Sequence, residues 1–285
     1  MTQPDITPFV TATHTLGEGP LWDADRHCLW WVDIEEQYVY RADADGQAVQ
    51  RWRLPERVGF VLPQPDGSFR LGLKSGLHRA QLHNNGTAEL ERIDRIDTES
   101  EHIRLNDGCQ DKAGIIYAGT MDMRTEEPLG NVYRYWPDGQ RTLLASDFVC
   151  ANGPGLSPDG QTLYLVETTG HEGRRQGIYT LPLDPDGAAG TETLLVDWSG
   201  HDGFPDGLSV APDGTFWVGQ WGGSTIRQFR PDGTLQRAID LPVRNPTKVA
   251  IAPDGTLYVT SARNGEPDEQ LTRYPLTGSV LKLTG

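Results

Sequence analysis

Four oxygen-bearing side chains occupy similar short segments that lie far apart in the sequence. Each has a glycine within two residues and lies seven residues before a turn residue of a repeated pattern; they are Glu18, Asn106, Asn152 and Asp206. Carboxylate and amide oxygens that converge form a site for a divalent cation. Two carboxylates brought together at low dielectric repel each other, and a bound cation removes that conflict. These residues therefore predict one divalent metal, with Ca²⁺, Mg²⁺, Mn²⁺, Zn²⁺ and Fe²⁺ all compatible with the donor set.

The repeated pattern is the tripeptide Pro-Asp-Gly. Proline presets φ for a turn, aspartate bonds to nearby backbone, and glycine takes a positive φ without strain. Each copy is therefore a candidate hairpin turn. The copies begin at Pro65, Pro137, Pro158, Pro185, Pro205, Pro212, Pro231 and Pro253.

The turns recur with a regular period. The turn glycines 67, 114, 160, 214 and 255 are between 41 and 54 residues apart, so six units of about 47 residues fill the 285 residues. Segments such as Leu156–Glu167 predict a hairpin in each unit, and segments such as Asn131–Gly139 predict a second one. Four strands per unit with this period are typical of β-propeller blades. We therefore predict an all-β, six-bladed β-propeller with four antiparallel strands per blade, formed by a single domain over residues 1–285.

The two ends of the chain are predicted to share one blade. The last unit ends at Ser279–Leu283, which supplies only its third strand, whereas Pro8–His14 is extended and has no unit of its own. We expect the N-terminal segment to supply the missing outer strand and close the ring.

The propeller explains how the four side chains meet. The innermost strand of each blade starts at one mouth of the central channel, so residues seven positions before each turn form a ring there. A plain turn at the start of a strand explains any single one of these residues, but four in one register position favour a site. The other two ring positions are Gly59 and Thr247. The returning second strands place Asp122, Trp221 and Arg263 near the rim, and Lys248, beside Thr247, is a further rim candidate.

Composition excludes several classes of protein. There are 25 Lys and Arg against 40 Asp and Glu, a formal net charge of −15, which disfavours nucleic acid and anionic membrane surfaces as partners. No stretch approaches ~20 apolar residues, and the N-terminus has no signal-peptide pattern. Three cysteines are too few for a disulfide framework, so we expect a cytoplasmic protein, a monomer or small homo-oligomer, in which Cys109 and Cys150 are packing residues.

The chain also resembles a known family. The order and spacing of the following segments are similar to those of the senescence marker protein/gluconolactonase (regucalcin-like) family, and especially of its bacterial sugar-acid lactonases: Leu16–Trp22, Trp31–Ile34, Arg104–Gly108, Ala118–Asp122, Ala151–Pro154, Phe204–Gly207, Thr260–Arg263 and Tyr274–Leu276. The resemblance implies a six-bladed propeller with one divalent metal at Glu18, Asn152 and Asp206. It also implies that Asp206 donates or accepts a proton and that Arg104 and Asn106 contact the substrate.

One position departs from the family pattern. Vertebrate members carry a substrate-contacting glutamate where this chain has Arg124, so Asp122 or Arg124 is expected to replace that contact. The resulting hypothesis is a metal-dependent hydrolase that opens a xylono-, arabinono- or gluconolactone to the sugar acid, with Asp206 as the base and a water or Asp107 as the alternative base. The alternative functions are a promiscuous esterase or organophosphate hydrolase, and a calcium-binding or protein-interaction propeller without catalytic activity.

Overall fold

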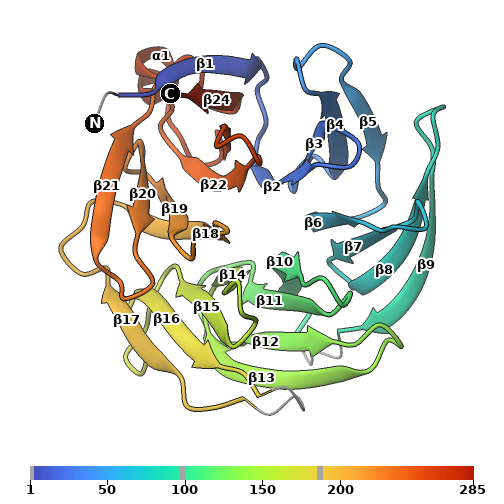
Figure 1. Cartoon of the computed structure of the whole chain (residues 1–285), viewed down its shortest axis with the longest axis vertical. Coiled ribbons are helices and arrows are strands. Elements are labelled where there is room, and N and C mark those ends of the chain that lie inside the picture. The colour runs from blue at the N-terminus through green and yellow to red at the C-terminus, as the bar shows by residue number, and fades with distance from the viewer. Residues whose placement is uncertain (1–2, 97–99, 185–188) are drawn as a thin grey trace.

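The computed structural model describes residues 3–96, 100–184 and 189–285. The described residues form six four-stranded antiparallel sheets arranged around one central axis (Figure 1). The fold predicted from the sequence, a six-bladed β-propeller, is confirmed.

Each blade runs from an inner strand at the axis to an outer strand at the rim. The first three blades are β2 (Gly17–Asp23), β3 (Cys28–Asp33), β4 (Tyr38–Asp43) and β5 (Gln50–Arg53); β6 (Val58–Pro63), β7 (Phe69–Leu73), β8 (Gly76–Leu82) and β9 (Ala88–Arg95); and β10 (Ile103–Gln110), β11 (Ile116–Asp122), β12 (Gly130–Tyr135) and β13 (Arg141–Phe148). The next two are β14 (Ala151–Leu156), β15 (Thr162–Glu167), β16 (Gly177–Pro182) and β17 (Thr193–Asp197); and β18 (Phe204–Val210), β19 (Phe216–Trp221), β20 (Thr225–Phe229) and β21 (Leu235–Asp240).

The sixth blade joins the two ends of the chain. It contains β22 (Pro246–Ile251), β23 (Leu257–Ser261), β24 (Val280–Thr284) and, as its outer strand, β1 (Asp5–Val10). Asp5 pairs with Thr284 and Val10 with Val280, which confirms the predicted closure. The closing strand lies a few residues earlier than the predicted Pro8–His14, because His14 already leaves the blade: its backbone N–H donates to Gly278 O, and its ring accepts a hydrogen bond from Trp31 Nε1 at 3.0 Å.

The described Pro-Asp-Gly copies form turns, with one exception. In the copy at Pro158, Gly160 N donates to Ser157 O at 2.9 Å, and Asp159 Oδ1 accepts from Gln161 N at 3.0 Å. The copy Pro205–Gly207 was expected to be a turn as well, and that expectation is wrong. It lies inside β18, where Pro205 pairs with Gln220 and the register then shifts. Proline is tolerated there because a bulge interrupts the ladder of hydrogen bonds. The copy at Pro185–Gly187 lies outside the described residues.

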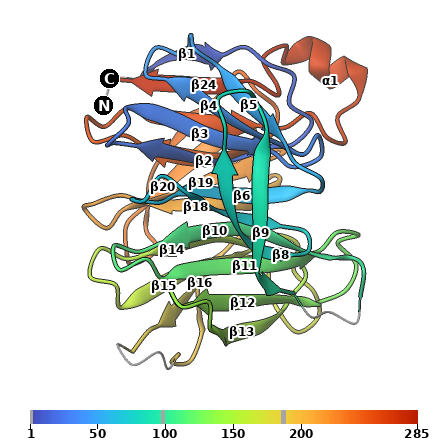
Figure 2. The same ribbon diagram turned by 90° about the vertical axis from the view of Figure 1, so that its right-hand side faces the viewer.

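One short helix interrupts the β-structure of the described residues. α1 (Asp268–Arg273) lies in the connection between β23 and β24, at one face of the disc (Figure 2). No periodic pattern predicted it, since six residues are fewer than two turns. No helix in the described part of the chain is long and apolar enough to cross a membrane.

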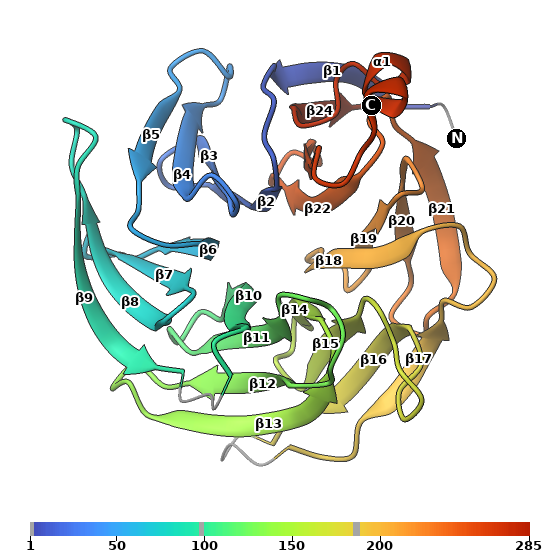
Figure 3. The ribbon, with the colours of Figure 1, turned by 180° about the vertical axis from the view of Figure 1, so that it is seen from behind.

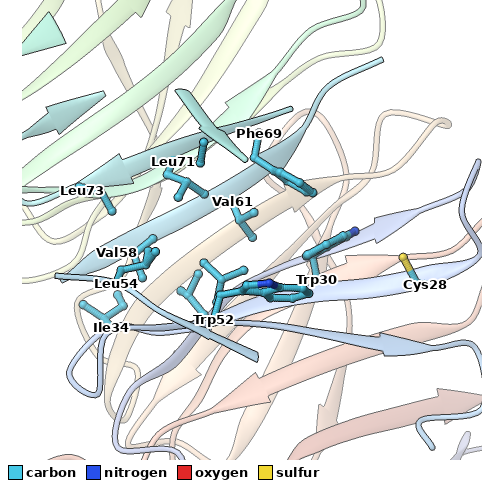
Figure 4. Packing of buried hydrophobic residues seen from close by; sticks show 13 residues of the cluster. Cys28, Trp30, Ile34, Trp52, Leu54, Val58, Val61, Phe69, Leu71 and Leu73 are labelled. Carbon is cyan, nitrogen blue, oxygen red and sulfur yellow. The ribbon is translucent and has the colours of Figure 1, made fainter. Parts of the chain in front are cut away.

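The hydrophobic core lies between neighbouring blades. Between the first and second blades, Trp30 packs with its ring centroid 4.8 Å from that of Phe69 and 5.7 Å from that of Trp52 (Figure 4). Similar clusters join the other blades. This packing fixes the inner strands, which are arranged around the central axis when the molecule is seen from the other face (Figure 3).

Candidate active site at one mouth of the channel

Every inner strand has a register shift close to its predicted ring position. The shifts fall between Glu18 and Leu21, Val58 and Phe60, Leu105 and Gly108, Asn152 and Gly155, Pro205 and Leu208, and Pro246 and Val249. A bulge adds a residue on one strand, bends the strand and redirects a side chain. Six equivalent bulges therefore place the ring residues at one level of the channel.

The structure brings most of the predicted residues into one cavity. This cavity has a volume of about 380 Å³, and its walls include Glu18, Arg104, Asn106, Asn152 and Asp206. All five of these residues are buried. The two remaining ring positions, Gly59 and Thr247, do not line the cavity and contact the backbone of neighbouring inner strands instead. A Cβ on Gly59 would lie 2.0 Å from Asn106 O, and Thr247 Oγ1 donates to Gly17 O at 2.7 Å.

Short hydrogen bonds organise the acidic side of the cavity. Asn152 Nδ2 donates to Asp206 Oδ1 and, at 3.3 Å, to Thr168 Oγ1. Asn152 Oδ1 accepts from Gly153 N at 2.9 Å, and Glu18 Oε2 accepts from Gly19 N at 2.8 Å. Neighbouring glycine N–H groups therefore orient two of the three side chains that were predicted to hold a metal.

Burial makes the two carboxylates of the cavity difficult to ionise. Desolvation, reinforced by the negative charge of Asp107, raises the pKa of Glu18 to about 7. Desolvation, followed by the charges of Glu18 and Asp107, raises the pKa of Asp206 well above its ordinary value. Neither Glu18 nor Asp206 forms an ion pair with any described residue. Two buried carboxylates without an ion-pair partner would be stabilised by a cation bound between them.

The donor chemistry of the cavity fits a divalent cation. Two carboxylates and one amide supply oxygen atoms, the ligands that hard cations prefer. The described residues contain no cluster of three His, Cys, Asp or Glu side chains able to hold a metal, so the set needs the amide of Asn152. Asn152 meets Asp206 through Nδ2, and its Oδ1, which accepts from Gly153 N, has a second lone pair that could bind a cation.

Arg104 forms the cationic side of the cavity. Its Nη1 donates to Asn106 Oδ1 at 2.7 Å and to Leu105 O at 3.1 Å, and Asn106 Nδ2 donates to Ala151 O at 3.2 Å. Arg104 has no carboxylate partner among the described residues, and its burial lowers the pKa of the guanidinium. A buried guanidinium beside a polar cavity is suited to bind oxygen atoms with partial negative charge.

Asp107 and Lys248 pair with each other instead of facing this cavity. Lys248 was predicted at the rim, and the structure places it elsewhere. Its Nζ lies 2.7 Å from both oxygens of Asp107, and its side chain lines a separate cavity of about 810 Å³ at the opposite mouth. The change of position arises because Lys248 lies within the bulge of β22, between Pro246 and Val249, and a bulge redirects a side chain. Since its carboxylate is engaged with Lys248, Asp107 is not free to act as a base.

Asp122 and Arg124 support a loop and do not line the cavity. Asp122 is fully buried, and its carboxylate accepts hydrogen bonds from the backbone N–H groups of Arg124, Glu126 and Glu127. Arg124 Nε lies 3.2 Å from Asp122 Oδ1. Among the other predicted rim residues, Trp221 lines the cavity, whereas Arg263 does not.

Several residues of the cavity were missed from the sequence, although a simple spacing identifies them. Side chains two residues apart in a strand point the same way, so residues two positions before the ring residues belong to the same surface. Five of them line the cavity: Arg104, which was predicted to contact the substrate, and Leu16, Arg57, Cys150 and Phe204, which were not. Arg57 is held by Glu35, with Nη2 2.6 Å from Oε2. Cys150 is buried, which agrees with its interpretation as a packing residue, and burial raises the pKa of its thiol.

Comparison with known proteins supports the expected family. Residues 16–263 match the family model described as the SMP-30/gluconolactonase/LRE-like region. The chain is 34% identical to a 6-deoxy-6-sulfogluconolactonase of Pseudomonas putida, over 93% of this chain and 89% of the relative. It is also 34% identical to an L-arabinolactonase of Azospirillum brasilense, over 96% and 90%. The crystal structure of regucalcin from Agrobacterium tumefaciens, a calcium-binding protein, is 26% identical, with a TM-score of 0.89 over 99% of this chain and 93% of that one.

The family match spans all six inner strands and every residue of the cavity except Asn264. The resemblance inferred from the sequence is thus confirmed, and the chain belongs to the SMP-30/gluconolactonase family, whose members include sugar lactonases.

Proposed function

We propose that this protein is a divalent-metal-dependent lactonase that opens a sugar aldonolactone to its aldonic acid. The observation that carries the proposal is the pair of buried carboxylates, Glu18 and Asp206, which lack a cationic partner and share a cavity with Arg104. The names of two bacterial relatives, which act on a sulfogluconolactone and an arabinolactone, support the same reaction class.

Glu18, Asn152 and Asp206 are the residues that would hold the metal. When bound, a divalent cation polarises an ester carbonyl and lowers the pKa of coordinated water. The donor set is compatible with Ca²⁺, Mg²⁺, Mn²⁺, Zn²⁺ and Fe²⁺. All of these residues belong to the proposed single domain of residues 1–285.

Asp206, Arg104 and Asn106 carry out the other steps of lactone hydrolysis. Asp206 accepts a proton from the water whose oxygen attacks the carbonyl carbon and so acts as a general base. Asp206 then returns the proton to the ring oxygen as the carbon–oxygen bond of the lactone breaks. Arg104 stabilises negative charge that develops on the carbonyl oxygen, and Asn106, held by Arg104, orients the sugar hydroxyls.

The test is a lactone screen with metal-free protein reloaded with each cation. Proton release, followed with a pH indicator, measures ring opening of xylono-, arabinono- and gluconolactone, with an aryl ester and a phosphotriester in parallel. We expect Asp206→Asn to lower kcat by about 10²–10⁴-fold. Asp232→Asn is the matched control, because Asp232 belongs to an exposed Pro-Asp-Gly turn of the same blade.

Three outcomes would contradict the proposal. One is no lactone turnover with any cation, the second is equal activity of the two variants, and the third is a clear preference for the aryl ester or the phosphotriester. Tight calcium binding without turnover would instead favour the non-catalytic alternative.

A further inference from the structure

A second cavity adjoins the candidate active site at the same mouth. It has a volume of about 860 Å³ and shares Phe204 and Trp221 with the smaller cavity. These two residues are cross-strand partners at the end of the β18–β19 hairpin. Asp206 follows Phe204 by two residues, and a strand advances ~3.3 Å per residue. The aromatic pair therefore stands ~7 Å along the strand from the proposed base and forms the boundary between the two cavities.

Three aromatic side chains line the second cavity. Phe204 is 45% exposed, although a large apolar side chain is normally buried. Tyr274, which follows α1, lines the cavity together with Trp221. Exposed aromatic groups around a depression mark ligand-binding grooves. The C–H faces of a sugar ring can pack on such side chains, while the hydroxyl groups remain free to form hydrogen bonds.

Arg244 supplies a donor that the protein itself leaves unused. Its Nη2 lies 3.8 Å from the position that a Cβ on Gly222 would take, so this glycine leaves room for the guanidinium. Among the described residues, Arg244 forms an ion pair with Glu266, with Nε 3.9 Å from Oε2, but the side chain donates no hydrogen bond, since this distance is too long for one. The side chain is 32% exposed, so its terminal N–H groups can donate to a ligand in the cavity.

The charge of the cavity distinguishes between classes of ligand. Three carboxylates, of Asp202, Asp240 and Glu266, line the cavity together with the guanidinium of Arg244, and Arg227 is close enough to interact with Asp202 and Asp240. This excess of negative charge disfavours a phosphate, sulfonate or carboxylate ligand. Hydroxyl groups both donate to carboxylates and accept from a guanidinium, so a neutral and hydroxyl-rich ligand fits the surface better.

We propose that the second cavity binds a neutral sugar unit linked to the lactone, so that the substrates include lactones of disaccharide aldonic acids. This inference rests on the proposed lactonase function of the Asp206 site. The reacting ring occupies the smaller cavity, and the second ring lies across the Phe204–Trp221 pair. There its hydroxyl groups accept from Arg244 and donate to the surrounding carboxylates.

The kinetic test compares a monosaccharide lactone with the corresponding β-linked disaccharide lactone. We expect the disaccharide lactone to have the higher kcat/KM. Arg244→Ala should lower that value by about tenfold or more, the loss of one charge-assisted hydrogen bond, and leave the value for the monosaccharide lactone within about twofold. Arg230→Ala, at an exposed arginine in a turn of the same blade, is the control and should change neither. Equal losses on both substrates, or slower turnover of the disaccharide lactone by the wild type, would overturn the inference.

A binding measurement separates this inference from the proposed function. A disaccharide alditol has the second sugar ring but cannot be hydrolysed, and its affinity can be measured by calorimetry. We expect binding to the wild type, and weaker binding by about tenfold to Arg244→Ala and to Tyr274→Leu. If the protein hydrolyses no lactone and still binds the alditol in this way, the proposed reaction fails and the sugar site stands. If lactones are hydrolysed and the alditol does not bind, the sugar site is refuted.

Discussion

Lys248 Nζ lies 2.7 Å from each carboxylate oxygen of Asp107, although the two residues are 141 positions apart in the chain. Both side chains are buried, with 7% and 4% of their surfaces exposed. The stem of Lys248 packs on Gly207, where a Cβ would lie 2.6 Å from that of the lysine. The charge of Asp107 acts on both Glu18 and Asp206. The ion pair thus forms a floor between the candidate active site and the cavity at the opposite mouth.

Removing only one partner of this pair should be costly. In Lys248→Met, Asp107 keeps a buried charge without its counterion, so we expect the free energy of unfolding to fall by about 3–5 kcal/mol. Urea denaturation measures the change. The double variant Lys248→Met/Asp107→Asn removes both charges, keeps the acceptor for Gly108 N, and should recover much of the loss. Equal stability of the single and double variants would show that the ion pair does not carry the effect.

Gly59 is predicted to tolerate no side chain. A Cβ at this ring position would lie 2.0 Å from Asn106 O, a backbone atom of the neighbouring inner strand. Gly59→Ala should therefore push two blades apart and lower the free energy of unfolding by about 3 kcal/mol, at the upper end of the overpacking range. Gly173→Ala is the control, because the nearest atom there, 3.1 Å away, belongs to the side chain of His171. We expect a change within about 0.5 kcal/mol in the control, and a similar result for Gly59→Ala would refute the close approach.

The sequence was sufficient to predict the blades and the ring, because turn chemistry fixes the register. The Pro-Asp-Gly turns at Pro65, Pro158, Pro212 and Pro253 follow inner strands, and counting back from Asp159 reaches Asn152. The same count from Asp213 reaches Asp206, although Asp206 itself belongs to a Pro-Asp-Gly copy that forms no turn. The tripeptide Pro-Asp-Gly alone therefore does not predict a turn, because the copy that contains Asp206 continues as a strand.

The surroundings of the ring were harder to predict. Lys248 follows a ring residue, but its side chain points toward the opposite cavity, a difference that depends on the bulge in β22. Asp122 lies at the end of a strand, where a residue that binds substrate could also lie. Its carboxylate oxygens instead accept hydrogen bonds from backbone N–H groups. Sequence alone does not reveal whether the oxygen atoms of such a carboxylate already accept hydrogen bonds from the protein's own backbone.

Asp122 and Arg124 are expected to differ in their effect on stability. Asp122→Ala leaves three buried or half-buried N–H groups without their acceptor, so the free energy of unfolding should fall by about 1–3 kcal/mol. Arg124→Ala removes only a partly exposed ion pair and should cost less than about 1 kcal/mol. Thermal and urea unfolding of both variants test the difference. Since Arg124 does not line the cavity, its variant should also keep KM for a lactone within about twofold, and a larger rise in KM would show that it contacts the substrate.

The two buried carboxylates predict opposite effects of pH with and without a divalent cation. The pKa of Glu18 rises from 4.5 to about 7 on folding, and that of Asp206 rises as well. Without metal, the folded state therefore holds more protons than the unfolded state, and stability is lost as the pH rises from about 4.5 through 7. A cation competes with those protons, so the increase in Tm on adding Ca²⁺ to chelator-treated protein should grow between pH 5 and pH 8. Glu18→Gln should reduce this growth, whereas the exposed-turn variant Asp232→Asn should not. An increase in Tm that is independent of pH would place the cation away from Glu18 and Asp206.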